Sequence, residues 1–112
     1  MMRNIFWKSI LAWLLAAFFF VGGIGNILAS DAIQADYARW GYPFWFHYLT
    51  GTLELIAGAL LISLRTRKLG SGLAAVVMCG AAATVLAHGE FTHAIAPLVV
   101  LSLSVFVWFT VE

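Results

Sequence analysis

The chain has 112 residues and a net charge of +1, with 63% hydrophobic and only 10% charged residues. A soluble domain of this size cannot hide that much apolar surface, so the composition excludes a soluble globular protein. We expect the lipid bilayer as the main partner and no binding of nucleic acid. The one cysteine, Cys79, excludes an internal disulfide and a Cys-x-x-Cys redox pair.

Four apolar stretches approach the roughly 20 residues that a helix needs to cross a bilayer. They predict membrane spans at about residues 7–28, 43–64, 69–88 and 93–111. The first span resembles a signal peptide, but its apolar core is longer than the roughly 7–15 residues of a signal sequence. No linker is long enough to separate domains. The sequence therefore predicts one all-α transmembrane domain over residues 1–112, an up-down-up-down four-helix bundle.

The charged residues predict the orientation of this bundle. Arg3 and Lys8 lie before and at the start of the first span, and three basic residues lie within 65–68, between the second and third spans. The loop at 29–42 carries two acids and one arginine. Because basic residues gather on the cytoplasmic side, both termini and the 65–68 turn are expected in the cytoplasm, which is an N-in/C-in topology. We interpret the basic turn as a determinant of topology.

Small residues on shared helix faces indicate close helix packing, because lipid gives apolar helices no other reason to associate. In the first span, Gly22 and Asn26 are four residues apart. The second span carries one stripe with a 4-3-4 spacing, which places four residues on one helical face. These residues are His47, Gly51, Glu54 and Gly58.

Glu54 lies eleven residues after Pro43, which at the helical rise is roughly 16 Å and close to the midplane of the bilayer. A charged side chain there costs at least ~2.5–3.5 kcal/mol, so we expect Glu54 to face the bundle as a neutral acid. Thr50, Cys79 and Ser102 are the candidate hydrogen-bond partners. Glu54 is either a structural link between helices or part of a polar cavity, and an ionisable group at this depth favours the cavity.

The histidines extend this hypothesis. The predicted topology brings His47, His88 and His93 to the outer side of the bundle, together with Glu90. His47 shares the helical stripe of Glu54, so the four outer residues suggest a polar funnel that leads down to the Glu54 carboxyl group. Imidazoles and a carboxylate are metal ligands, but the spacing matches no compact ligand motif, and we predict no metal site.

Several segments carry a family resemblance: "FFFVGGIGNIL", "YPFWFHYLTGTLELIAGALLI" and "MCGAAATVLAHGE". In this order they resemble the DoxX-like family of small four-helix membrane proteins, and Gly51 and Glu54 match that family's Gly-x-x-Glu. Asn26 departs from the pattern, because many relatives have a lysine there. A lysine–carboxylate pair is therefore not expected in this chain.

The resemblance implies a bacterial inner-membrane protein, since some members resemble the membrane subunit of thiosulfate:quinone oxidoreductase. The leading hypothesis is an accessory subunit that binds a quinone or another small amphipathic ligand near Glu54. The expected ligand-binding residues are Glu54, His47, Gly51, His88, Asn26 and Glu90. The chain has no flavin, haem or iron–sulfur motif, so we expect no cofactor of its own, no autonomous catalysis, and a redox partner protein that supplies electrons.

Two alternatives come from other functional classes. The first is a membrane scaffold or chaperone that assembles partner proteins, which predicts a bundle without an internal polar cavity. The second is a small proton-coupled transporter that acts as a homo-oligomer, since one bundle of this size encloses little volume. In the transporter, Glu54 would carry the proton.

Overall fold

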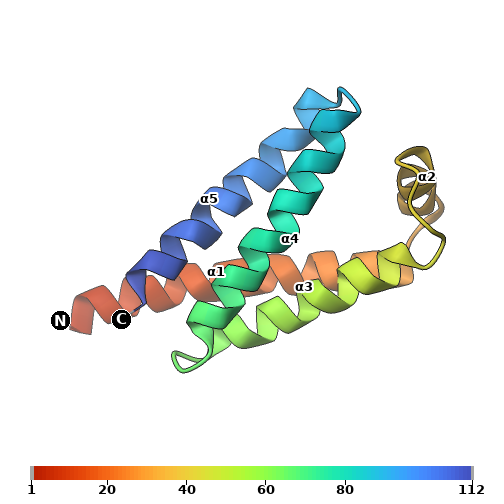
Figure 1. The fold of residues 1–112 in the computed structure, drawn as a ribbon. Coiled ribbons are helices and arrows are strands. Elements are labelled where there is room, and N and C mark those ends of the chain that lie inside the picture. The colour runs from red at the N-terminus through yellow and green to blue at the C-terminus, as the bar shows by residue number, and fades with distance from the viewer. Residues whose placement is uncertain (1, 112) are drawn as a thin grey trace.

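The computed structural model describes residues 2–111, and this part of the chain is all-helical (Figure 1). The predicted all-α class is confirmed. In chain order the elements are α1 Met2–Leu28, α2 Asp31–Arg39, α3 Phe46–Ile62, α4 Arg67–Ala87, the 3-10 helix η1 Phe91–Ala94, and α5 Ile95–Thr110.

Within the described residues, three helical segments are long and apolar enough to cross a membrane: Phe6–Leu28, Arg67–Ala87 and Phe91–Thr110. The second predicted span is shorter. It was expected from residue 43 to 64, but α3 has 17 residues, because the chain turns through Pro43 before the helix begins and leaves it at Ser63. At 1.5 Å per residue α3 is about 26 Å long, at the lower limit for a spanning helix. The protein is an integral membrane protein built as a helical bundle.

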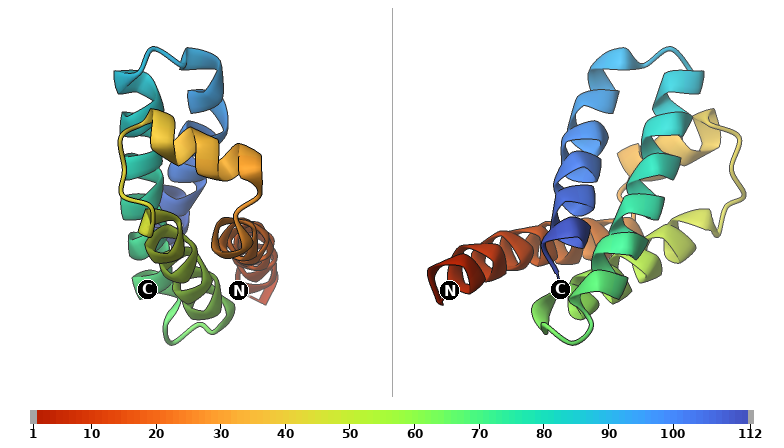
Figure 2. Two further views of the ribbon diagram at one scale, coloured as in Figure 1. Left: turned by 90° about the vertical axis from the view of Figure 1, so that its right-hand side faces the viewer. Right: turned by 60° about the vertical axis from the view of Figure 1, so that its left-hand side comes forward.

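The long helices pack as two pairs. Helix α1 lies along α3, and α4 lies along α5, while α3 and α4 join the pairs through the turn at residues 63–66. The α4–α5 hairpin is inclined to the α1–α3 pair, so the two pairs diverge away from this turn (Figures 1 and 2). Helix α1 has few contacts with α5.

Glycines set the distance between α1 and α3. A Cβ atom added to Gly23 would lie 2.8 Å from the carbonyl oxygen of Gly51, and one added to Gly51 would lie 2.7 Å from that of Gly23. The two helices therefore meet backbone against backbone, as expected for a membrane bundle that relies on small residues. This contact fixes the register of the α1–α3 pair.

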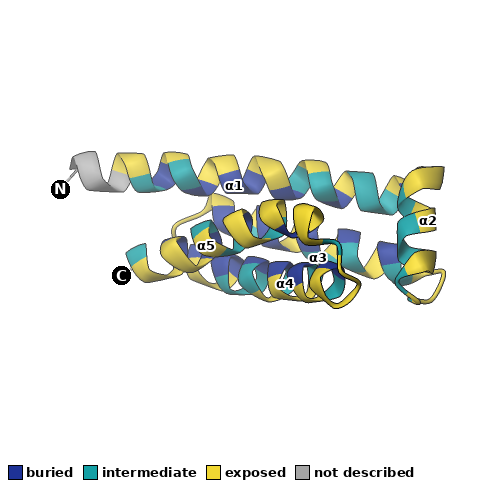
Figure 3. Cartoon of the chain, turned by 90° about the horizontal axis from the view of Figure 1, so that it is seen from above, coloured by how far each residue is buried: buried dark blue, intermediate teal, exposed yellow. Residues whose placement is uncertain are grey.

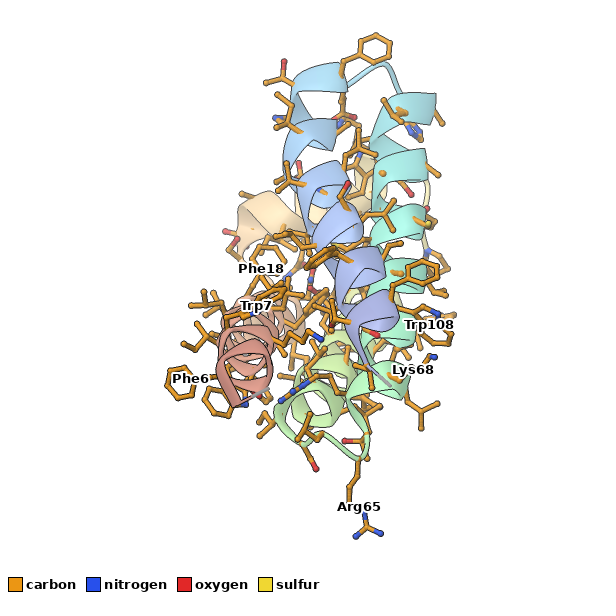
Figure 4. All side chains as sticks on the ribbon, turned by 90° about the vertical axis from the view of Figure 1, so that its left-hand side faces the viewer. Phe6, Trp7, Phe18, Arg65, Lys68 and Trp108 are labelled. Atoms are coloured by element: carbon orange, nitrogen blue, oxygen red, sulfur yellow. The ribbon has the colours of Figure 1, made fainter. Side chains whose placement is uncertain are left out.

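The core lies where the two pairs are closest. Phe19 of α1, Leu61 of α3 and Val107 of α5 are fully buried or nearly so, and Met78 of α4 packs into the same cluster. The outward faces carry large exposed apolar side chains, including Phe6 and Phe18, as expected for a surface in contact with lipid (Figures 3 and 4).

Arg67 differs from the other basic residues of the α3–α4 turn. Its guanidinium is buried and donates to the carbonyl oxygens of Leu61 and Ile62 at 3.0 Å and to Ser9 Oγ at 3.1 Å. It thereby satisfies carbonyl groups at the end of α3, where a helix has no further N–H donors. Arg65 points away from the bundle (Figure 4). Arg67 therefore also holds helices together, a structural role that the interpretation of the turn as a topological signal does not include.

Helix α2 was not predicted. It lies across the ends of α1 and α3 (Figures 1 and 3) and buries none of its residues fully. Ser30 caps its N-terminus by accepting from the backbone N–H of Ile33 at 3.3 Å, and Asp31 and Arg39 match the helix dipole at the two ends.

Candidate ligand pocket between the two helix pairs

A pocket of about 490 Å³ lies between the two helix pairs, with α2 along one side. It is bounded by the last turns of α1 and α4 and the first turns of α3 and α5. Its volume falls in the range of small-molecule sites in proteins. Four aromatic side chains contribute to its wall: Tyr37, Trp40, Tyr42 and Phe46. Its polar side chains are those of Asn26, Asp36, Thr50, Thr84 and His93, together with the groups on the aromatic rings.

Glu54 is buried, with 4% of its surface exposed, and its carboxyl group faces α1. The expectation that it points into the bundle is confirmed. Asn26 donates from Nδ2 to Glu54 Oε1 at 2.5 Å and to the carbonyl oxygen of Gly22 at 3.1 Å. A Cβ atom on Gly22 would lie 2.6 Å from Glu54 Oε2, so the missing side chain makes room for the carboxyl group.

The predicted partners of Glu54 are wrong. Thr50 donates to the carbonyl oxygen of Phe46 in its own helix, Ser102 does the same toward Leu98, and Cys79 is exposed. The reason is the direction of the polar stripe on α3. Since Gly51 packs against Gly23 of α1, Glu54, one turn further on, also meets α1 and not α4 or α5.

Asn26 connects three helices. Besides its bond to Glu54, its Oδ1 accepts from the Tyr37 hydroxyl of α2 at 2.9 Å, and its backbone oxygen is 2.8 Å from His47 Nδ1 of α3. Burial raises the pKa of Tyr37 above its usual value, so this hydroxyl keeps its proton. Asn26 itself lines the pocket, whereas Glu54 and Gly51 lie behind it.

His47 does not face the same pocket as His93. It is buried and lines a second pocket of about 400 Å³ between α2 and the start of α3, for which Tyr37 and Tyr42 form the shared wall. Its Nε2 is buried and, within the described part of the chain, makes no hydrogen bond. Tyr37 and Tyr42 therefore divide the predicted single funnel into two pockets.

Glu90 lies at the rim of the larger pocket and accepts hydrogen bonds from Arg39 Nη2 at 2.8 Å, Trp40 Nε1 at 2.9 Å and His93 Nδ1 at 3.1 Å. These donors, Arg39 first, lower the pKa of Glu90 to about 2. The pKa of Arg39 is raised in turn by Glu90 and Asp36. The Tyr42 hydroxyl also bonds to Thr84. The contacts of Glu90 with Arg39 and of Tyr42 with Thr84 link α2 and the turn after it to the end of the α4–α5 hairpin.

His88 does not join this arrangement. It is exposed, and its Nδ1 contacts the carbonyl oxygen of Thr84 at 2.8 Å. The histidines therefore lie at three separate places: in the second pocket, at the end of α4 and at the pocket rim. Within the described residues, no three His, Cys, Asp or Glu side chains are grouped closely enough to hold a metal ion.

Fold and site together define a helical membrane protein with an aromatic-lined pocket at the open end of two helix pairs. The family model described as the DoxX-like family matches residues 10–107, a segment that includes every residue of the pocket. The chain belongs to the DoxX-like family, which confirms the resemblance in its sequence. No curated protein and no solved structure matches the chain.

Proposed function

We propose that this protein is a membrane accessory subunit that binds a small amphipathic ligand of the quinone type in the larger pocket. The observation that supports the proposal is the pocket itself, which combines aromatic walls with a polar floor at Asn26 and Thr50. Ligand sites are typically such cavities, mostly apolar with a few polar groups that fix orientation. Flat aromatic head groups suit walls made of Tyr37, Tyr42 and Phe46.

The predicted site residues take different roles in this proposal. Asn26 contacts the ligand, and Glu54 is a positioning residue that orients Asn26 through their 2.5 Å hydrogen bond. Gly51 acts through the packing of α3 on α1, and Glu90 holds α2 over the pocket. His47 belongs to the second pocket, and His88 lines neither pocket.

The pocket favours this function over the two alternatives. A scaffold requires no polar pocket between its helices, and here a half-open pocket of about 490 Å³ lies between them. A proton-coupled transporter requires a route past Glu54 to the opposite end of the bundle. Phe19, Leu61 and Val107 fill that region and are buried almost completely.

Electrons for a quinone-type ligand would come from a partner protein, because the sequence offers no redox cofactor motif. We further propose a bacterial inner-membrane location, on the basis of the family, and an orientation with both termini in the cytoplasm, on the basis of the basic residues around 65–68. A membrane-impermeant maleimide tests this orientation on an Arg65→Cys variant in the Cys79→Ala background. Labelling in inverted but not in right-side-out vesicles is expected, and the reverse result contradicts the orientation.

Gly80 and Gly25 provide a matched pair for testing the pocket. A Cβ atom added to either would meet no atom within 4 Å, but only Gly80 lines the pocket. We expect Gly80→Leu to lower the affinity for a short-tailed benzoquinone by about tenfold or more, because its side chain occupies the ligand volume. Gly25→Leu should bind as the parent does.

Equilibrium dialysis with the protein in lipid nanodiscs gives both affinities, and circular dichroism checks that each variant is folded. Equal binding by the parent and Gly80→Leu would place the ligand elsewhere and overturn the proposal.

A further inference from the structure

The hydroxyl groups that line the larger pocket already donate their hydrogens to acceptors within the protein. Each hydroxyl carries one hydrogen to donate and lone pairs to accept. The Tyr37 hydroxyl donates to Asn26 Oδ1 at 2.9 Å, and Thr50 donates to the carbonyl oxygen of Phe46 at 3.2 Å. In both cases the partner can only accept, so the direction of the hydrogen bond is determined. What these hydroxyls present to the pocket is a lone pair.

Tyr42 and Thr84, which line the opposite side of the pocket, also have no hydrogen left to donate to a ligand. Thr84 Oγ1 donates to the carbonyl oxygen of Gly80 at 2.8 Å. Its one proton is thereby committed, so the Tyr42 hydroxyl must be the donor in the contact between the two side chains. Both oxygens keep only acceptor capacity.

The nitrogen donors of the pocket are engaged as well. The two hydrogens of Asn26 Nδ2 go to Gly22 and Glu54, and Trp40 Nε1 donates to Glu90. His93 Nδ1 faces the carboxylate of Glu90 at 3.1 Å and therefore carries the hydrogen, which leaves the other ring nitrogen as an acceptor in the neutral ring. Among the side chains that line this pocket, every hydrogen-bond donor is used within the protein.

The pocket therefore offers acceptors to its ligand. Asp36 adds a carboxylate, but Arg39 pairs with it at 2.8 Å, so its charge is balanced and favours a neutral donor over a cation. A ligand carbonyl in this pocket would lose its bonds to water and find no donor, which is unfavourable. A ligand hydroxyl would find a lone pair.

We propose that the pocket selects the reduced, dihydroxylated form of its aromatic ligand, a hydroquinone, over the oxidised quinone. This inference rests on the proposed function and specifies which form of the ligand is retained. Two hydroxyl–acceptor contacts correspond to a preference of about tenfold or more for the hydroquinone. The selection concerns binding alone, since no step of electron transfer is assigned to this chain.

Three ligands of one shape test the inference: a short-tailed hydroquinone, its quinone, and the dimethyl ether of the hydroquinone, which has no donor. Each is titrated anaerobically into the protein in lipid nanodiscs and followed by equilibrium dialysis. We expect the hydroquinone to bind about tenfold or more tightly than either of the others.

A Thr50→Val variant removes one acceptor at nearly constant volume. It should weaken binding of the hydroquinone about threefold to tenfold and weaken binding of the quinone by less. The matched control is Ser102→Ala, which removes an exposed hydroxyl outside the pocket. The control should not change either affinity.

The outcomes separate this inference from the proposed function. If the quinone or the dimethyl ether binds as tightly as the hydroquinone, selection by acceptors is wrong while the binding site stands. If none of the three ligands binds saturably, both the selection and the proposed ligand class are wrong.

Discussion

The two ends of the bundle use polar groups in opposite ways. At the α3–α4 turn, the single guanidinium of Arg67 donates to three oxygens, and the neighbouring helices close over an apolar core. At the α2 end the helix pairs diverge, and polar groups on five elements surround a pocket. A buried polar residue in a membrane helix is therefore no marker of a ligand site by itself. What distinguishes the α2 end is unused acceptor capacity facing an open volume.

The largest effect is expected when the hydrogen bonds of Arg67 are removed at the α3–α4 turn, the closed end of the bundle. Arg67→Met removes the guanidinium donors of the Leu61 carbonyl oxygen and Ser9 Oγ, and leaves the Ile62 carbonyl oxygen with Trp13 Nε1 alone, so we expect a loss of about 3 kcal/mol or more in the free energy of unfolding. Arg65→Met, at the exposed position two residues earlier, should stay within about 0.5 kcal/mol. Denaturation in mixed micelles measures both variants. Equal stability would show that the buried guanidinium is not a structural link.

Gly22→Ala should have the next largest effect, and it acts at the open end. The added Cβ would lie 2.6 Å from Glu54 Oε2 and displace the carboxyl group from Asn26, at a cost of about 1–3 kcal/mol. Gly25→Ala is the control, since its Cβ meets nothing within 4 Å, and it should be neutral or slightly stabilising. The same unfolding measurement compares the two variants.

Glu54→Gln tests whether the carboxyl group positions Asn26 or carries a proton. Gln keeps an oxygen that accepts from Asn26 Nδ2, so we expect a stability change below about 1 kcal/mol and at most about a threefold change in ligand affinity. Glu54→Leu removes that acceptor and should weaken binding further. Binding that is abolished in Glu54→Gln would show that the carboxyl group itself takes part and would revive the proton-coupled alternative.

The smallest effect concerns the rim of the pocket. Because the pKa of Glu90 is lowered to about 2 in the folded protein, its contact with Arg39 stabilises the fold at every pH above the usual value near 4.5. This contribution is lost as the pH falls from about 4.5 to 2. We expect the difference in melting temperature between the parent and Glu90→Gln to be constant above pH 5 and to shrink below it. A difference that persists at pH 2 would contradict this role of Glu90.

The sequence predicts the helical class and the long apolar segments well, because both depend on composition along the chain. The burial of Glu54 also follows from its place on the stripe with Gly51 and Gly58. The partner of Glu54 could not be predicted in the same way. It depends on the register between α1 and α3, which the contact of Gly23 with Gly51 determines in three dimensions.

Helix α2 and Arg67 were missed for different reasons. Helix α2 has nine residues, and its inward face of Ile33 and Tyr37 is too short to stand out as an apolar period, although the Ser30–Asp31 start and the Arg39 end are recognisable helix signals. Arg67 stands among other basic residues, and nothing in the local sequence separates the one that turns inward. The shared wall of Tyr37 and Tyr42 depends on α2, so the division into two pockets was missed with it.

The unequal lengths of α1 and α3 affect the surrounding lipid. Helix α1 has 27 residues and α3 has 17, yet they are packed side by side, so one bilayer thickness cannot match both. Hydrophobic mismatch of this kind is relieved by tilting the longer helix or by thinning the bilayer beside the shorter one. Lipids with short acyl chains should therefore match α3 better than lipids with long chains. The length of the acyl chains should also determine how deeply the first turns of α3 lie below the headgroups.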